Sequence, residues 1–129
     1  MVIDMVNTDI SPASDPGKIL SKAVLKAADL LGLNHATLAR ILGLSAATIS
    51  RMSSGHYTLS QARKEWELGV LFVRLFRSLD SIAAGRDSDA RAWLHSKNVA
   101  LSGVPSTILE SVQGLVLVVD YLDAVRGRV

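Results

Sequence analysis

Polar side chains able to hydrogen-bond to nucleic acid are concentrated in a segment of seven residues; they are Ser45, Thr48, Ser50 and Arg51. Hydroxyl groups bond to phosphates or base edges, and a guanidinium binds phosphate or guanine. Ala46 and Ala47 stand among them and offer only methyl groups, which contact thymine methyls but read no hydrogen-bonding pattern. We therefore expect modest base readout, with phosphates supplying much of the affinity and Arg51 making the strongest single contact.

The sequence contains no pattern typical of catalysis or metal binding. Gly17-Lys18 lacks the upstream glycine and the following Ser or Thr of a phosphate-binding loop. The three histidines lack metal-ligand spacing, and no serine occupies a nucleophile elbow. The carboxylates Asp87 and Asp89 more simply begin a helix, where negative charge suits the dipole. We expect no enzymatic activity, no metal and no cofactor.

The segment 38–54, LARILGLSAATISRMSS, has the pattern of a DNA-binding helix-turn-helix. Ala39 is small enough for two helices to cross closely, Gly43 suits the left-handed end of the first helix, and Ser45 can cap the second. Apolar residues fall at the inward positions, which are Leu38, Leu42, Leu44, Ile49 and Met52. The pattern predicts a recognition helix over 45–53. An ordinary hairpin of two helices is the structural alternative.

Positive charge is concentrated in the same half of the chain. Residues 16–64 contain seven Lys and Arg but a single Asp, whereas residues 65–129 contain seven basic and eight acidic residues. Phosphate contacts need such an excess, because each neutralised phosphate releases counterions. We expect residues beside the motif to hold the DNA backbone; they are Lys18, Lys22, Arg40, His56 and Tyr57. A basic face exposed to solvent without a partner is the alternative.

Length and composition limit the number of domains, the oligomeric state and the location of the protein. The chain has 129 residues, enough for one domain or two small ones, and 49 % of them are hydrophobic, which suggests burial against a second subunit or a partner. We expect a two-fold symmetric dimer that binds paired DNA half-sites, since a single small DNA-binding domain binds DNA weakly. The absence of cysteine fits a cytoplasmic location. The apolar run 115–119 is too short to cross a bilayer, and no positively charged start marks a signal peptide, so no membrane association is expected.

The helical spacing of apolar residues, together with residues typical of helix ends, predicts an all-α fold. After an arm over 1–15, Asp15 and Pro16 begin a helix that stops at Gly32. Asn34 caps the next helix, and Ser60 caps a long one reaching about residue 84. Short helices are expected from Asp89 and Pro105, and a last one over 115–125 after an interruption at Gly114. The long helix carries two apolar stripes and is expected to be buried on two sides, joining the two halves of the chain or packing across a dimer axis.

The second half of the chain resembles the toxin-binding domain of the Xre/MbcA/ParS antitoxins. The residues that carry this resemblance are Trp93-Leu94, Asn98, Leu101, Gly103, Pro105, Leu109, Gly114, Val118, Leu122 and Gly127. Behind a helix-turn-helix, the domain resembles the antitoxin of RES–Xre toxin–antitoxin systems. Lys97 replaces a frequent proline, and Val104 replaces a frequent capping threonine, which leaves the helix at Pro105 without a good side-chain cap.

The resemblance implies a homodimeric antitoxin that binds operator DNA of its own operon and covers the active site of a RES-domain, NAD-degrading toxin. Together with the pattern along the chain, it predicts three regions: a flexible arm over 1–15, which the resemblance does not cover, a helix-turn-helix domain with a connecting helix over 16–84, and a toxin-binding domain over 85–129. The residues implied in toxin binding are Trp93, Asn98, Leu122, Val125, Arg126, Gly127, Arg128 and Val129. Arg126 and Arg128 would fill charge sites meant for a nucleotide.

Two other interpretations stay open from the sequence. The chain could be a stand-alone helix-turn-helix regulator whose C-terminal half dimerises or binds a ligand. Residues 126–129 could be a frayed basic tail rather than an insert into a toxin.

Overall fold

The structure, a computed structural model, describes residues 15–127. The predicted arm up to residue 14 and the predicted toxin-binding Arg128 and Val129 lie outside the described residues. Within that range the chain forms helices and no strand. The helices are α2 (Pro16–Leu30), α3 (His35–Leu42), α4 (Ala46–Ser53), α5 (Lys64–Ile82), α6 (Asp87–His95), α7 (Pro105–Ile108) and α8 (Val112–Gly127).

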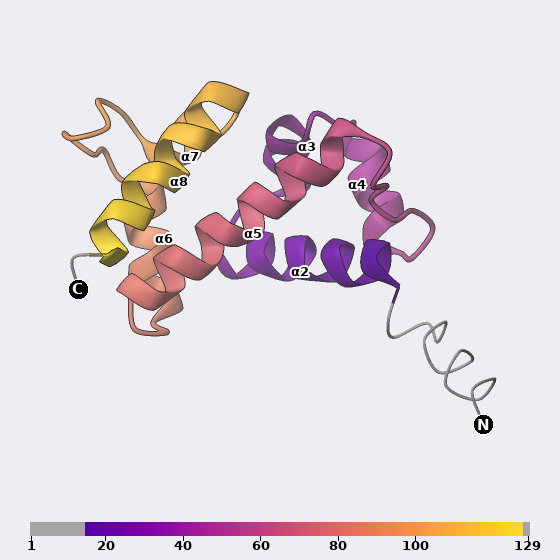
Figure 1. Ribbon diagram of the computed structural model, residues 1–129, viewed down its shortest axis with the longest axis horizontal. Helices are drawn as coiled ribbons and strands as arrows, with labels where there is room; N and C mark the ends of the chain where they lie inside the picture. Colours follow the sequence, from indigo (N-terminus) through magenta and orange to yellow (C-terminus); the bar gives the residue numbers. More distant parts are fainter. Residues whose placement is uncertain (1–14, 128–129) are drawn as a thin grey trace.

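Helix α5 crosses the whole molecule and organises the rest. Figure 1 shows α2, α3 and α4 around its N-terminal part and α6, α7 and α8 around its C-terminal part. The predicted all-α architecture is confirmed: a helix-turn-helix bundle is joined by a long helix to a small C-terminal helical domain.

The first three helices begin where the sequence predicts, because each has a side-chain cap. Asp15 accepts a hydrogen bond from the Gly17 N–H at 2.9 Å. Asn34 accepts from the Thr37 N–H at 2.8 Å, and Ser45 from the Thr48 N–H at 3.1 Å. Each cap satisfies an N–H group that the helix itself leaves without a partner. Gly43 ends α3 with a φ of 69°, the left-handed conformation expected for it.

Helix α5 begins later than predicted, and Ser60 is not its cap. The Ser60 hydroxyl accepts from the Ala62 N–H at 3.2 Å, within a turn that precedes the helix. The Ser60 N–H donates to the carboxylate of Glu65 at 3.0 Å. Glu65, only 4 % exposed, therefore fixes the approach to α5, which starts at Lys64 without a side-chain cap.

Two further boundaries differ from the prediction. Helix α6 starts at Asp87 rather than Asp89. Helix α8 starts at Val112 and runs through Gly114, which does not interrupt it. A Cβ atom at position 114 would lie 1.9 Å from the backbone oxygen of Ile108, so glycine serves there for close approach between α7 and α8. As predicted, α7 begins at Pro105 without a side-chain cap.

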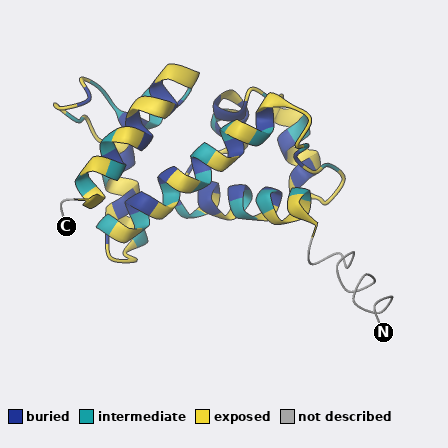
Figure 2. Ribbon diagram, in the orientation of Figure 1, coloured by how far each residue is buried: buried dark blue, intermediate teal, exposed yellow. Residues whose placement is uncertain are grey.

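The core follows α5 from end to end. Phe72, Leu75 and Leu79 are at most 2 % exposed and belong to one apolar cluster with buried residues of both halves. Burying one such side chain stabilises the fold by about 1.5–3 kcal/mol. The other predicted stripe of α5 is only half covered: Trp66 and Val73 are partly buried, and Val70 is 46 % exposed. Figure 2 shows exposed and buried positions interspersed along α5.

Among residues 15–127, no helix combines the length and the apolar character needed to cross a membrane.

Candidate functional site

The predicted DNA-reading residues form a hydrogen-bonded ridge along α4. Ser45 and Thr48 share a hydrogen bond between their hydroxyl oxygens at 2.9 Å, and the Arg51 guanidinium donates to the Thr48 hydroxyl at 3.0 Å. These residues are three apart and so lie on one face of the helix. Arg51 is exposed and is held along this face. The ridge therefore presents a cation whose position is already restricted.

The remaining predicted residues of α4 are also on its surface. Ala46, Ala47 and Ser50 are exposed. The Ser50 hydroxyl lies 3.5 Å from Nδ1 of His35, the first residue of α3. In the sequence, His35 stands out only as one of three histidines without metal-ligand spacing, and its position beside α4 is not predicted. Its place at the start of the first helix of the motif is the signal that could have found it, because that helix crosses the DNA backbone.

Basic side chains of α2 lie beside the end of α4. Lys18 and Lys22 line a pocket of about 340 Å³ together with Ser53, Gly55 and Tyr57. Both lysines are exposed. The structure thus brings two of the predicted phosphate-binding residues next to α4, the predicted recognition helix, although they are far from it in sequence.

Tyr57 has a structural partner rather than a free hydroxyl. Its phenolic O–H donates to the carboxylate of Glu65, with oxygen–oxygen distances of 2.7 and 2.6 Å to the two carboxylate oxygens. Burial and this hydrogen bond to an anion raise the pKa of Tyr57 above its ordinary value of 10. The side chain therefore keeps its proton and serves as a donor within the fold.

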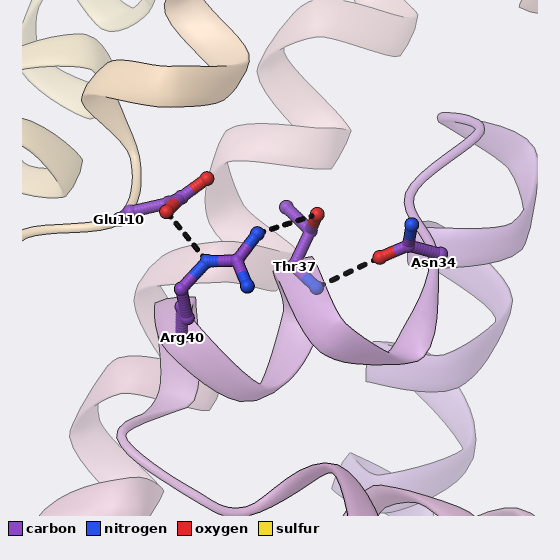
Figure 3. Close-up of polar contacts among 4 residues, drawn as sticks. All are labelled: Asn34, Thr37, Arg40 and Glu110. Carbon is purple, nitrogen blue, oxygen red and sulfur yellow. Dashed lines mark hydrogen bonds and ion pairs between the residues drawn. The ribbon is translucent and has the colours of Figure 1, made fainter.

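Arg40 extends toward Glu110 of the C-terminal half (Figure 3). Its Nε donates to Glu110, between α7 and α8, at 2.6 Å, and its Nη2 to the Thr37 hydroxyl at 3.3 Å. The ion pair joins the helix-turn-helix half to the C-terminal half. The structure does not bring Arg40 together with the Ser45, Thr48 and Arg51 ridge.

Three of the predicted toxin-binding residues meet in the C-terminal half. Trp93, Leu122 and Val125 line a pocket of about 240 Å³ between α5, α6 and α8. Trp93 stacks on Tyr121 with ring centroids 6.3 Å apart. Leu122 is only 2 % exposed, however, so its side chain packs the core and is not offered to a partner in this conformation.

Asn98 also has a role within the fold. Its side-chain oxygen accepts a hydrogen bond from the Leu101 N–H at 3.0 Å, and its backbone pairs with Gly103 at 2.8 and 3.2 Å. It shapes the loop between α6 and α7 and does not line the pocket with Trp93 and Val125.

The end of α8 is exposed and basic. Arg126 and Gly127 are exposed, and the Arg126 guanidinium reaches the Ser78 hydroxyl at 3.4 Å. Ser78 also donates to Asp123 at 2.9 Å, and Asp123 pairs with Arg74. This polar network fastens the end of α8 to α5.

Helix α8 also exposes apolar side chains that were not predicted from the sequence. Val112, Val116 and Leu117 on α8 are 60 %, 39 % and 51 % exposed. The run 115–119 is entirely apolar, so it cannot turn every side chain toward the core of a helix that packs on one side. That argument could have predicted the face from the sequence.

No group of three or more potential metal ligands occurs within residues 15–127.

Comparison with known families matches almost the entire chain. Residues 13–74 match the antitoxin Xre-like helix-turn-helix domain, and residues 78–128 match the antitoxin Xre/MbcA/ParS C-terminal toxin-binding domain. Neither is a family of enzymes. The two matched regions meet within α5. A search of curated proteins finds no match.

Proposed function

The chain belongs to the Xre-type antitoxins, with a DNA-binding helix-turn-helix domain and a toxin-binding domain, and we propose that its toxin is a RES-domain enzyme that degrades NAD. We propose further that the antitoxin represses its own operon as a homodimer, in the cytoplasm. The match to a toxin-binding domain favours this function over that of a stand-alone regulator.

On DNA, α4 serves as the recognition helix. The observation that carries this assignment is the Ser45–Thr48–Arg51 ridge, in which Ser45 and Arg51 are exposed and which lies close to the basic pocket that Lys18 and Lys22 line. Arg51 contacts a base edge or phosphate, while Lys18 and Lys22 hold the backbone. Ala46 and Ala47 contribute apolar contacts only, so affinity depends strongly on salt.

The toxin is contacted by the end of α8 and the residues beside it. The observation that carries this assignment is the exposed, basic end of α8, next to the pocket that Trp93 and Val125 line. Arg126, Gly127, Arg128 and Val129 enter the toxin's cleft, where the two arginines occupy space and charge sites meant for a nucleotide substrate. Leu122 and Asn98 act indirectly, by holding α8 and the preceding loop in place.

A direct test uses the protein encoded by the neighbouring gene. If that protein has a RES domain, we expect it to co-purify with this chain and to consume NAD only when free. The measurement is NAD concentration over time with increasing amounts of antitoxin. NAD consumption that continues unchanged in the presence of excess antitoxin would contradict the proposal.

A further inference from the structure

An apolar groove lies between α2 and α5 and is unrelated to the recognition ridge. It has a volume of about 690 Å³ and is lined by Ile19, Leu20, Trp66, Val70 and Val73 among others. Ile19 is 53 % exposed and Val70 46 % exposed, although both are large aliphatic side chains on well-formed helices. The half-covered stripe of α5 forms one wall of the groove.

One part of the groove wall is strongly basic. Arg74, Arg77 and Arg126 all line it. Arg74 pairs with Asp123, and Arg126 contacts Ser78. Within residues 15–127, Arg77 makes no ion pair or side-chain hydrogen bond. The groove therefore combines apolar walls with an excess of guanidinium groups, which suits an apolar segment that carries carboxylates.

The residues before α2 have this composition. Residues 1–14 contain no Lys or Arg, two carboxylates (Asp4 and Asp9) and a set of apolar residues, which includes Val2, Ile3, Met5, Val6 and Ile10. The segment also ends at the groove, because Asp15 caps α2 and the next residue, Pro16, lines the groove wall. We propose that residues 2–10 bind in the α2–α5 groove of their own chain.

The length of the segment allows this. The α2 face of the groove, from Pro16 to Ala23, spans about 10 Å at 1.5 Å per residue. A turn over residues 11–14, which include Pro12, would reverse the chain direction. Extended chain covers roughly 3.3 Å per residue, so residues 2–10 reach roughly 30 Å and pass the whole groove. The carboxylates of Asp4 and Asp9 then come within reach of the arginines.

A second copy of the chain fits the groove less well. Two copies that meet through the same face present the same arginines to a shared interface, which brings like charges together. A tethered segment also has an effective concentration in the millimolar range, so it needs little intrinsic affinity to occupy the groove.

The chain contains no cysteine, which makes crosslinking a clean test. We would introduce Val6→Cys with Val70→Cys and treat the protein with a short bismaleimide at low protein concentration. The control pair is Val6→Cys with Val99→Cys, since Val99 is 89 % exposed and lies in the loop between α6 and α7. We expect an internally crosslinked monomer in several-fold higher yield from the first pair. Adding Asp4→Lys and Asp9→Lys should reduce that yield several-fold, because lysines repel the arginines.

Equal yields from the two pairs would overturn the proposal. A product found only as a covalent dimer would also overturn it, because the segment would then reach a second copy. Deletion of residues 2–12 provides a second measurement: we expect greater fluorescence of an apolar dye on the shortened chain, reversed by Val70→Lys. Unchanged dye fluorescence on deletion would contradict an occupied groove even if the crosslinking variants folded poorly.

Discussion

At the scale of single residues, we propose that Arg51 is the side chain on which DNA affinity most depends. It is exposed on α4 and already restricted by its hydrogen bond to Thr48. Arg51→Ala should weaken operator binding by about 1–3 kcal/mol if it contacts a base, which is roughly a fivefold to 150-fold loss. Titration of labelled operator at fixed salt measures this.

Arg86→Ala is the matched control for Arg51. Arg86 is also exposed, and its Nε contacts a residue three positions later, Asp89, at 2.5 Å, but it lies at the start of α6 in the C-terminal half. Its replacement should leave operator affinity unchanged. Equal losses of operator affinity from the two substitutions would show only a general effect of positive charge. They would contradict the proposal that Arg51 contacts the operator directly.

Because of Tyr57, the stability of the fold should depend on pH in the alkaline range. The neutral phenol donates to buried Glu65, and the pKa of Tyr57 is raised by burial first and by Glu65 second. A raised pKa in the folded state means that the stabilisation is fully present below the unfolded pKa, near 10, and is lost as the pH rises above it. Tyr57→Phe should cost about 1.5–3 kcal/mol at pH 7.

The measurement is urea unfolding of the parent and Tyr57→Phe at several pH values. The difference in unfolding free energy between them should shrink once the pH exceeds about 10, because the parent then loses its proton donor as well. A difference that stays constant through that range would contradict the role given to this hydrogen bond.

The binding surface was partly predictable from residue types. Ser45, Thr48 and Arg51 follow from the helical spacing, because contacts three residues apart are local. The places that Asn98 and Leu122 take in the fold could not be predicted from residue types. Their roles depend on a loop pairing with Gly103 and on burial in the core beside α5, which are tertiary contacts that spacing alone does not show.

At the scale of elements, Gly114 controls how closely α7 approaches α8. A side chain there would meet the backbone oxygen of Ile108, which cannot turn aside as a side chain can. Gly114→Ala should destabilise the fold by about 1–3 kcal/mol or more, as overpacking does. Gly127→Ala in the same helix meets nothing within 4 Å and should stay within about 1 kcal/mol of the parent.

Urea unfolding of the two variants distinguishes these effects. If Gly114→Ala unfolded at the same urea concentration as the parent, this would contradict the claim that the close approach of α7 to α8 requires glycine at position 114.

The first residues of the helices show which helix starts can be predicted from neighbouring residues alone. Asp15, Asn34 and Ser45 cap their helices through residues two or three positions away, so their pattern is sufficient. Ser60 looks like a cap by the same criterion. The carboxylate of Glu65 instead binds the Ser60 N–H and Tyr57. Because of this competing interaction, α5 begins only at Lys64.

At the scale of the whole molecule, α5 belongs to both halves. The match to the DNA-binding domain ends and the match to the toxin-binding domain begins within this helix. The halves are also joined by the Arg40–Glu110 pair, whose side chains are 55 % and 30 % exposed. Such a pair contributes at most about 1 kcal/mol. Apolar burial along α5 is therefore the main cause of their association.

Truncation after Val125 tests most directly whether the two activities are divided between the two halves. Removal of residues 126–129 takes away the exposed end of α8 and one weak contact to Ser78, and leaves α4 untouched. Toxin neutralisation, measured as growth of cells that co-express the toxin, should be lost, while operator affinity stays close to that of the parent; Arg51→Ala should show the reverse. Full growth rescue by the truncated chain, or loss of both activities together, would contradict the account.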